Sequence, residues 1–269
     1  MGYPKFEYKY LYPKELYEPL RRRIERMCPL DPHAAREKTG RYTIRSVYFD
    51  SLRFHTYDDK IEGVHKRRKF RIRVYGLQRP DSVAFLEIKQ KTGALLTKYR
   101  APVLYDDLPA LFSDMDYMQY VRDGRGAGID RGNARHWMYH YITRKLCPVV
   151  LVDYERTAFA GEKSFDLRIT LDSDIRGEMF PSLTGMFNEE GVHAAMPGMG
   201  ILEVKFTHGI PLWMRNIIRS HDLQRLALSK YTICVDALRH DARHQRRAVT
   251  VLDRSERTAR HLASVFAPF

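Results

Sequence analysis

Residues 69–76 read KFRIRVYG, a run in which every second position from Lys69 to Arg73 carries a positive charge. Successive side chains of an extended strand point to opposite faces, so Lys69, Arg71 and Arg73 share one face and three apolar side chains share the other. Taken alone, this alternating pattern predicts a half-buried antiparallel strand with its charged face in water. The interpretation changes if neighbouring strands carry charges of the same sign.

The composition is that of a folded and strongly basic protein. The chain has 269 residues, 44% of them hydrophobic and 12% aromatic, which is enough to build a core. Its net charge of +13 predicts an anionic partner: nucleic acid, a phosphate-rich small molecule or a membrane surface. Cys28, Cys147 and Cys234 have neither metal-ligand nor redox spacing, which suits a reducing compartment. Because we find no membrane-spanning run and no apolar signal core, we expect a soluble, cytoplasmic protein.

Five further strand-like segments repeat the pattern of one apolar and one charged face. They are FEYKY (6–10), VAFLEIKQK (83–91), VVLVDYERTAF (149–159), FDLRITLD (165–172) and ILEVKF (201–206). Like charges on adjacent strands repel, by about 4 kcal/mol for a pair 4 Å apart at an effective dielectric constant near 20. An anionic ligand among these cations is therefore a better explanation than a plain solvent face.

A curled sheet would bring the charged faces together. If the strands form a barrel, the charged side chains line its interior and helices cover the apolar outside. We expect those helices at 14–30, within 106–146 and at 211–227, in one α+β domain. Duplex DNA is too wide for a small barrel, whereas a phosphate chain fits between Arg forks and Lys point charges. A divalent metal would explain the carboxylates among the cations.

The ordered segments resemble a known family. FEYKY, SVYFDS, KFRIRVYG, FLEIKQK, TKYR, YERTAF, LRITLD, ILEVKF and LSKY together resemble the catalytic domain of the vacuolar transporter chaperone (VTC) proteins, which belong to the triphosphate tunnel metalloenzymes together with the CYTH proteins. The resemblance implies an eight-stranded antiparallel β-barrel with a charged lumen and flanking helices. We assign residues 1–237 to this tunnel domain and 238–269 to a basic, helical C-terminal tail.

The resemblance also implies an activity. It is the metal-dependent polymerisation of inorganic polyphosphate from the γ-phosphate of ATP, with Mn²⁺ or Mg²⁺ as cofactor. The catalytic cations implied by position are Arg71, Arg73 and Lys205. The implied phosphate ligands are Lys9, Lys89, Lys98, Tyr154, Arg156, Arg168 and Lys230. Glu203 would hold the metal, and Glu7 is either a second metal ligand or a salt-bridge partner.

The first strand separates two activities of this fold. In hydrolytic CYTH relatives, the first strand resembles the motif ExExK, in which two alternating glutamates precede a lysine. This chain has Lys5 at the position of the first glutamate, followed by Glu7 and Lys9. The lost carboxylate favours a polymerase. A tripolyphosphatase or nucleoside triphosphatase of the same fold and a non-catalytic polyphosphate-binding module remain as alternatives.

The expected partners are ATP and inorganic polyphosphate. Nucleic acid is not expected, because the cations alternate within strands instead of lying along an exposed helix with stacking aromatics. Eukaryotic VTC relatives add a regulatory SPX domain and membrane helices that this sequence lacks. We therefore expect any membrane or regulatory partner to be a separate chain.

Overall fold

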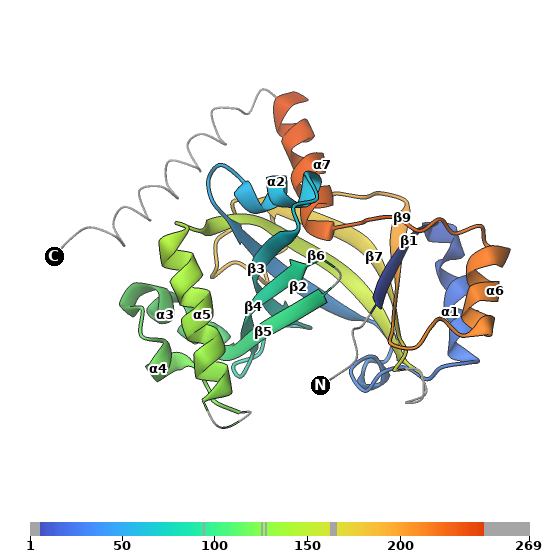
Figure 1. Cartoon of the computed structure of the whole chain (residues 1–269), viewed down its shortest axis with the longest axis horizontal. Coiled ribbons are helices and arrows are strands. Elements are labelled where there is room, and N and C mark those ends of the chain that lie inside the picture. Colours follow the sequence, from blue (N-terminus) through green and yellow to red (C-terminus); the bar gives the residue numbers. More distant parts are fainter. Residues whose placement is uncertain (1–5, 94, 125, 127, 162–165, 245–269) are drawn as a thin grey trace.

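A single antiparallel sheet organises the chain (Figure 1). The computed structural model describes residues 6–244 apart from 94, 125, 127 and 162–165. Eight strands follow one another in the order β1-β9-β7-β6-β2-β3-β4-β5, and the short β8 pairs with β7 outside this order. The strands are β1 (Phe6–Pro13), β2 (Tyr42–Asp50), β3 (Lys66–Tyr75), β4 (Val83–Thr92), β5 (Leu95–Leu104), β6 (Cys147–Ala160), β7 (Arg168–Met179), β8 (His193–Ala194) and β9 (Met199–Phe206).

The sheet curls until its two ends face each other. Lys89 on β4 and Glu7 on β1 lie near opposite ends of the strand order, yet Lys89 Nζ is 3.0 Å from Glu7 Oε2. No backbone ladder joins β1 to β5 within the described residues, so the sheet is a half-barrel. The predicted eight main strands, their antiparallel pairing and the curl are confirmed. The predicted closure of the barrel is not confirmed, because the contact between the two ends of the sheet is an ion pair of side chains and not a ladder of backbone hydrogen bonds.

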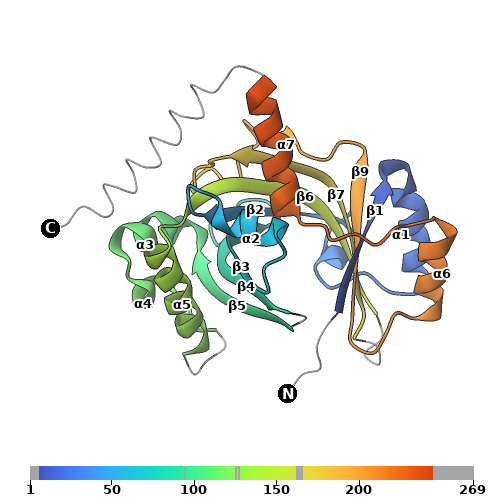
Figure 2. The same ribbon diagram turned by 45° about the horizontal axis from the view of Figure 1, so that its top comes forward.

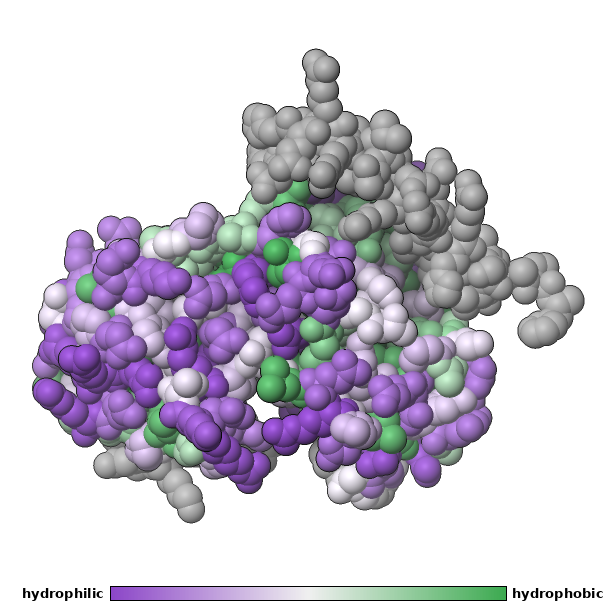
Figure 3. All heavy atoms as spheres, turned by 180° about the vertical axis from the view of Figure 1, so that it is seen from behind, coloured by the Kyte–Doolittle hydropathy of each residue, from purple (hydrophilic) through white to green (hydrophobic). Residues whose placement is uncertain are grey.

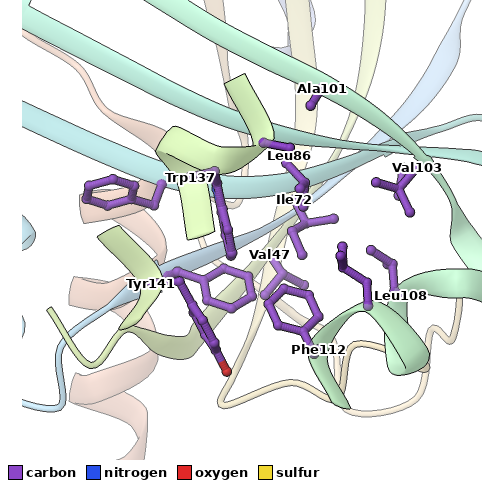
Figure 4. Close-up of a cluster of buried hydrophobic side chains, with 14 of the residues drawn as sticks. Val47, Ile72, Leu86, Ala101, Val103, Leu108, Phe112, Trp137 and Tyr141 are labelled. Atoms are coloured by element: carbon purple, nitrogen blue, oxygen red, sulfur yellow. The ribbon is translucent and has the colours of Figure 1, made fainter. Parts of the chain in front are cut away.

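The outer face of β2–β5 packs against helices. These are α3 (Leu108–Asp114), α4 (Tyr117–Tyr120) and α5 (Ile129–Thr143). Phe70 and Ile72 of β3 are fully buried in this cluster together with Trp137 of α5 (Figure 4). The apolar half of KFRIRVYG therefore faces the helical layer, as its alternation predicts.

Two further helical layers complete the fold. Helices α1 (Tyr17–Glu25) and α6 (Leu212–Ser220) cover the outer face of β1, β9 and β7, where Leu20 and Met214 pack against Leu202 and Val204. Helices α2 (His55–Ile61) and α7 (Lys230–His244) lie together at one end of the curled sheet (Figures 1 and 2). The short 3-10 helices are η1 (Lys14–Leu16), η2 (Ala34–Arg36) and η3 (Tyr105–Asp107).

Helix α7 packs on the inner face of the sheet. Tyr231 and Val235 of α7 share an apolar cluster with Val150 and Val152 of β6, which alternate with outward-facing residues. The helix therefore closes one end of the half-barrel. Seen from behind, the molecule shows an opening between its two sides, bordered largely by hydrophilic side chains (Figure 3).

The expected helices at 14–30, within 106–146 and at 211–227 correspond to α1, to α3–α5 and to α6. The proposed boundary at 237/238 falls inside α7, and residues 245–269 of the predicted tail lie outside the described residues, as does Lys5. Among the described helices, none is both long and apolar enough to cross a membrane.

Candidate functional site

The inner face of the half-barrel encloses a pocket lined almost entirely by charged side chains, which we name the central pocket. It draws on β1, β2, β3, β4, β6 and β9 and on the first turn of α7. Eight of the lining residues are basic and only two are acidic. The lining residues are Glu7, Lys9, Tyr48, Lys69, Arg71, Arg73, Lys89, Tyr154, Arg156, Glu203, Lys205, Ser229 and Lys230.

Ten of the twelve residues predicted for the site line this pocket. The two exceptions are Lys98 and Arg168, which are not among its lining residues. Lys98 Nζ lies 2.7 Å from Glu87 Oε1, and its side chain is 44% exposed. The Arg168 guanidinium lies 2.9 Å from Asp31 Oδ2 and is 49% exposed. Both are engaged by carboxylates at the margin of the site, and their role as phosphate ligands stays a prediction.

Arg71 is held in place by a buried carboxylate on the next strand. Glu87 of β4 is the ladder partner of Arg71 and is 1% exposed. Arg71 Nε donates to Glu87 Oε2 at 2.7 Å, and its Nη1 donates to the Tyr48 hydroxyl at 3.0 Å. Burial alone would raise the pKa of Glu87, but Arg71 together with Arg73 and Lys98 holds it far below its usual value. Glu87 is therefore ionised and fixes the Arg71 fork.

Arg156 has an equivalent partner on β7. Its guanidinium makes a two-pronged contact with Asp172, with Nε to Oδ1 at 2.6 Å and Nη2 to Oδ2 at 2.8 Å. Lys230, at the start of α7, also donates to Asp172. Asp172 is completely buried, and although burial opposes ionisation, Arg156 and Lys230 lower its pKa. One carboxylate thus orients two pocket cations from different elements.

The two acidic residues of the pocket share a lysine. Lys9 Nζ lies 2.9 Å from Glu7 Oε1 and 3.7 Å from Glu203 Oε2, and Lys205 Nζ lies 2.6 Å from Glu203 Oε1. Burial and the neighbouring Glu203 act to raise the pKa of Glu7, but Lys9, Lys89 and Lys205 lower it to about 2. Both carboxylates are ionised at neutral pH and available as ligands.

This pair fits a divalent cation that takes its remaining ligands from phosphate. Mg²⁺ is typically bound by one or two carboxylates together with substrate phosphate oxygens. Glu7 and Glu203 supply that number of carboxylates beside the phosphate-binding cations. Within the described part of the chain, no group of three or more His, Cys, Asp or Glu side chains is placed to hold a metal without such help.

Lys69 has an environment unlike that of the other cations. Its Nζ donates to the hydroxyl of Ser229, which immediately precedes α7. Burial, and then the positive charges of Lys9 and Lys89, holds the pKa of Lys69 well below its usual value. Its amine therefore loses its proton more readily than the amine of an ordinary lysine.

The sequence analysis placed Lys69 on the charged face without assigning it a role, and it missed Tyr48 and Ser229 in the lining and the supporting roles of Glu87 and Asp172. Strand alternation carried a signal for three of these five residues. Lys69 and Glu87 share faces with predicted ligands on their own strands, and Asp172 lies four positions after Arg168. Nothing local marks Ser229, because it reaches the pocket only through the packing of α7.

Comparison with known proteins identifies one family whose model matches most of this chain. The model of a family described as VTC domain matches residues 5–239. No curated protein matches the chain. Similar solved structures include the PH1819 protein from Pyrococcus horikoshii OT3, with 11% identity over 86% of this chain and 99% of that one and a TM-score of 0.44.

Two other similar structures carry descriptive names. One is a putative adenylyl cyclase from Hippeastrum described as having a dominant triphosphatase activity, with 10% identity over 86% of this chain and 94% of that one and a TM-score of 0.46. The other is a putative adenylate cyclase from Vibrio parahaemolyticus, with 10% identity over 87% of this chain and 98% of that one and a TM-score of 0.43. The family match covers residues 5–239, and this range includes every residue that lines the central pocket.

Proposed function

This chain belongs to the VTC domain family, and on that premise we propose that it is a polyphosphate polymerase. It transfers the γ-phosphate of ATP onto a growing chain of inorganic polyphosphate, breaking the bond between the γ-phosphorus and the bridging oxygen so that ADP leaves, with a divalent metal, Mn²⁺ or Mg²⁺, as cofactor. The observation that carries the proposal is the central pocket, in which eight basic side chains face only two carboxylates. Such an excess of positive charge favours the binding of an anion of high charge density among these side chains.

The arrangement of the cations suits a linear anion. Lys69, Arg71 and Arg73 occupy alternate positions on β3, so the first and third lie about 13 Å apart along the strand. Lys9, Arg156 and Lys205 face them from β1, β6 and β9. We infer that the half-barrel functions as a tunnel with a charged lumen, in which the Glu7–Lys89 pair completes the wall between β1 and β4.

The chemistry asks little of the protein beyond charge and alignment. The terminal oxygen of a polyphosphate chain is already anionic at neutral pH, so its attack on the γ-phosphorus needs no strong general base. Arg71 and Arg73 are held by Glu87 and Ser46 and would bind the oxygens of the transferring group without reorganising. Lys205 would neutralise the charge that develops between the two phosphates.

The remaining residues position the two substrates. Lys9, Lys89, Arg156 and Lys230 would bind the phosphates on either side of the transferring group. The Tyr154 hydroxyl accepts a hydrogen bond from Arg73 Nη2 at 3.4 Å. Glu203 and Glu7 would hold the metal, which supplies further charge neutralisation when bound. Lys98 and Arg168 would take part at the margin of the site if phosphate displaces their carboxylate partners.

The test is incubation of the purified protein with ATP and Mn²⁺, followed by separation of the products on a polyphosphate gel. We expect a ladder of lengthening chains that EDTA abolishes. Arg73→Ala and Glu203→Ala should each reduce product formation on the order of a hundredfold or more, as for the loss of one preorganised charge-stabilising group. Arg215→Ala, which removes an exposed arginine of α6, is the matched control and should leave the ladder unchanged.

The products separate the alternatives. Free phosphate without a ladder would identify a tripolyphosphatase or nucleoside triphosphatase and contradict the polymerase. Binding of polyphosphate with neither product would identify a binding module and contradict any enzymatic function.

A further inference from the structure

The inner face of the sheet continues beyond the central pocket as a small aromatic cluster. Tyr75 follows Arg73 by two positions on β3, and Phe85 of β4 is the ladder partner of Arg73. Their rings meet edge to face, with centroids 5.9 Å apart. Neither ring is among the residues that line the pocket, and both are partly exposed. At the Tyr75 end, the phosphate-binding face therefore continues into two partly exposed aromatic rings.

An arginine lies flat on this cluster. The Arg100 guanidinium carbon is 3.5 Å from the centroid of the Phe85 ring, and its Nη2 donates to the Tyr75 hydroxyl at 3.4 Å. Its Nε lies 3.3 Å from Glu87 Oε1, the carboxylate that also holds Arg71. Arg100 is thus fixed in plane by three partners. A guanidinium stacked in this way presents a flat, weakly hydrated surface.

The opposite end of the pocket has a different character. There Lys69 meets Lys9 and Lys89, and Lys60 of α2 lies within electrostatic range of Lys9 and Lys91. Tyr231 also lies at that end, with its ring 5.9 Å from Lys69 Nζ, and Tyr48 stacks on it, but both of these rings are buried. The two ends of the pocket are therefore suited to different parts of a substrate: one to further phosphates, and the other to a flat ring.

We propose that Tyr75, Phe85 and Arg100 form the base-binding subsite for a nucleoside triphosphate whose phosphates occupy the central pocket. The inference rests on the proposed function, because it takes the pocket to be a phosphate site. Every nucleobase has a π-face that stacks on aromatic rings and on Arg planes, so the subsite selects nucleoside triphosphates over inorganic tripolyphosphate without reading one particular base. It also sets the direction of the substrates, with the base at the Tyr75 end and the polyphosphate chain at the Lys69 end.

The experiment compares two ligands that share a triphosphate. Isothermal titration calorimetry in EDTA, where no turnover occurs, measures the dissociation constants of ATP and of tripolyphosphate for each protein. In Tyr75→Leu and Phe85→Leu we expect the ATP dissociation constant to rise roughly tenfold, as for the loss of one stacking partner. The tripolyphosphate constant should not change, and Tyr75→Phe should retain the affinity of the wild type for ATP.

A tyrosine on the other face of the sheet gives the matched control. Tyr99 of β5 stacks on His136 of α5, at 4.6 Å between ring centroids, and Tyr99→Leu should alter neither constant. An unchanged ATP constant in Tyr75→Leu and Phe85→Leu, or an equal loss for both ligands, would overturn the base subsite while leaving the phosphate pocket intact. If the wild type binds neither ligand in EDTA and does not bind tripolyphosphate with Mn²⁺ present either, the proposed function fails and the subsite with it.

Discussion

Buried carboxylates decide how the cations of the central pocket are presented. Glu87 holds Arg71 from the neighbouring strand, and Asp172 holds Arg156 together with Lys230. Each removes some of the repulsion among like charges and fixes the direction of a guanidinium fork. Because eight basic side chains face only two lining carboxylates, a positive excess remains for a ligand. The pocket is thus preorganised for an anion that is not part of the fold.

Asp172→Asn tests this arrangement. The amide keeps the shape of the side chain but leaves Arg156 and Lys230 without their buried counter-charge, so we expect the free energy of unfolding to fall by about 3–5 kcal/mol. Tripolyphosphate should restore part of this loss. Urea unfolding with and without tripolyphosphate measures both effects.

Asp174→Asn is the matched control for this change. Asp174 lies two residues further along β7 and pairs with Lys14, and its side chain is 39% exposed. We expect its replacement to alter stability by less than about 1 kcal/mol. Equal losses in both variants would contradict a special role for the buried carboxylate.

The buried position of Lys69 leads to a prediction about proton uptake when a ligand binds. Burial, and then Lys9, Lys89, Lys60 and Arg71, lowers its pKa well below the usual value, so this amine loses its proton more readily than that of an ordinary lysine. An anion favours the charged form and raises that pKa, so ligand binding takes up protons at a pH close to the lowered pKa of the free protein. Calorimetry of tripolyphosphate binding at one pH in buffers of different ionisation enthalpy measures this uptake.

The uptake should shrink in Lys69→Met. Lys66→Met, an exposed position on the same strand, serves as the control and should retain the uptake. Proton release on binding, or an uptake that persists in Lys69→Met, would show that another group is responsible.

At the level of elements, α5 covers the outer face of β2–β5, and within this group β3 contributes three residues to the pocket. Trp137 is fully buried against Phe49, Phe112 and Tyr141, on the opposite side of the sheet from Arg71 (Figure 4). The helix exposes its other side, where Tyr139 is 60% exposed. We therefore expect the buried face of α5, which includes Trp137, to contribute more to stability than its exposed face.

Trp137→Ala should lower the free energy of unfolding by about 3–5 kcal/mol, the usual range for removing a large buried aromatic side chain. Tyr139→Ala, two residues further along the same helix, should change it by no more than about 0.5 kcal/mol. Chemical unfolding followed by circular dichroism measures both values. A mild effect of Trp137→Ala would mean that the sheet holds its curvature without this helical layer.

For the whole molecule, the open seam and the net charge of +13 predict that ligand and fold stabilise each other. A ligand at 100 times its dissociation constant adds about 2.7 kcal/mol of stability. For a chain of this size we therefore expect tripolyphosphate to raise the melting temperature by about 5–10 °C. Differential scanning calorimetry measures the shift.

Two controls belong with this measurement. Sodium sulfate at equal ionic strength should raise the melting temperature less, because a single compact anion cannot contact cations on both walls. Added salt should diminish the effect of tripolyphosphate, since it screens the exposed part of the interaction. An equal shift with sulfate would contradict a site built for a phosphate chain.

The sequence by itself determined which face of each strand is charged. The alternation in KFRIRVYG separates Arg71 and Arg73 from Phe70 and Ile72, because side-chain direction in a strand depends only on the local backbone. The same local rule, together with the family resemblance, identified ten residues of the central pocket.

Only the tertiary structure decided which of these faces meet. The distance between Glu7 and Lys89 depends on the curl summed over the whole sheet, and no segment of sequence contains it. The same holds for Ser229, which reaches the pocket through the packing of α7, and for Lys98 and Arg168, which are drawn to carboxylates on other elements. Alternation is a property of one strand, whereas a pocket, an ion pair across a seam and an aromatic cluster are properties of several, set by long-range packing.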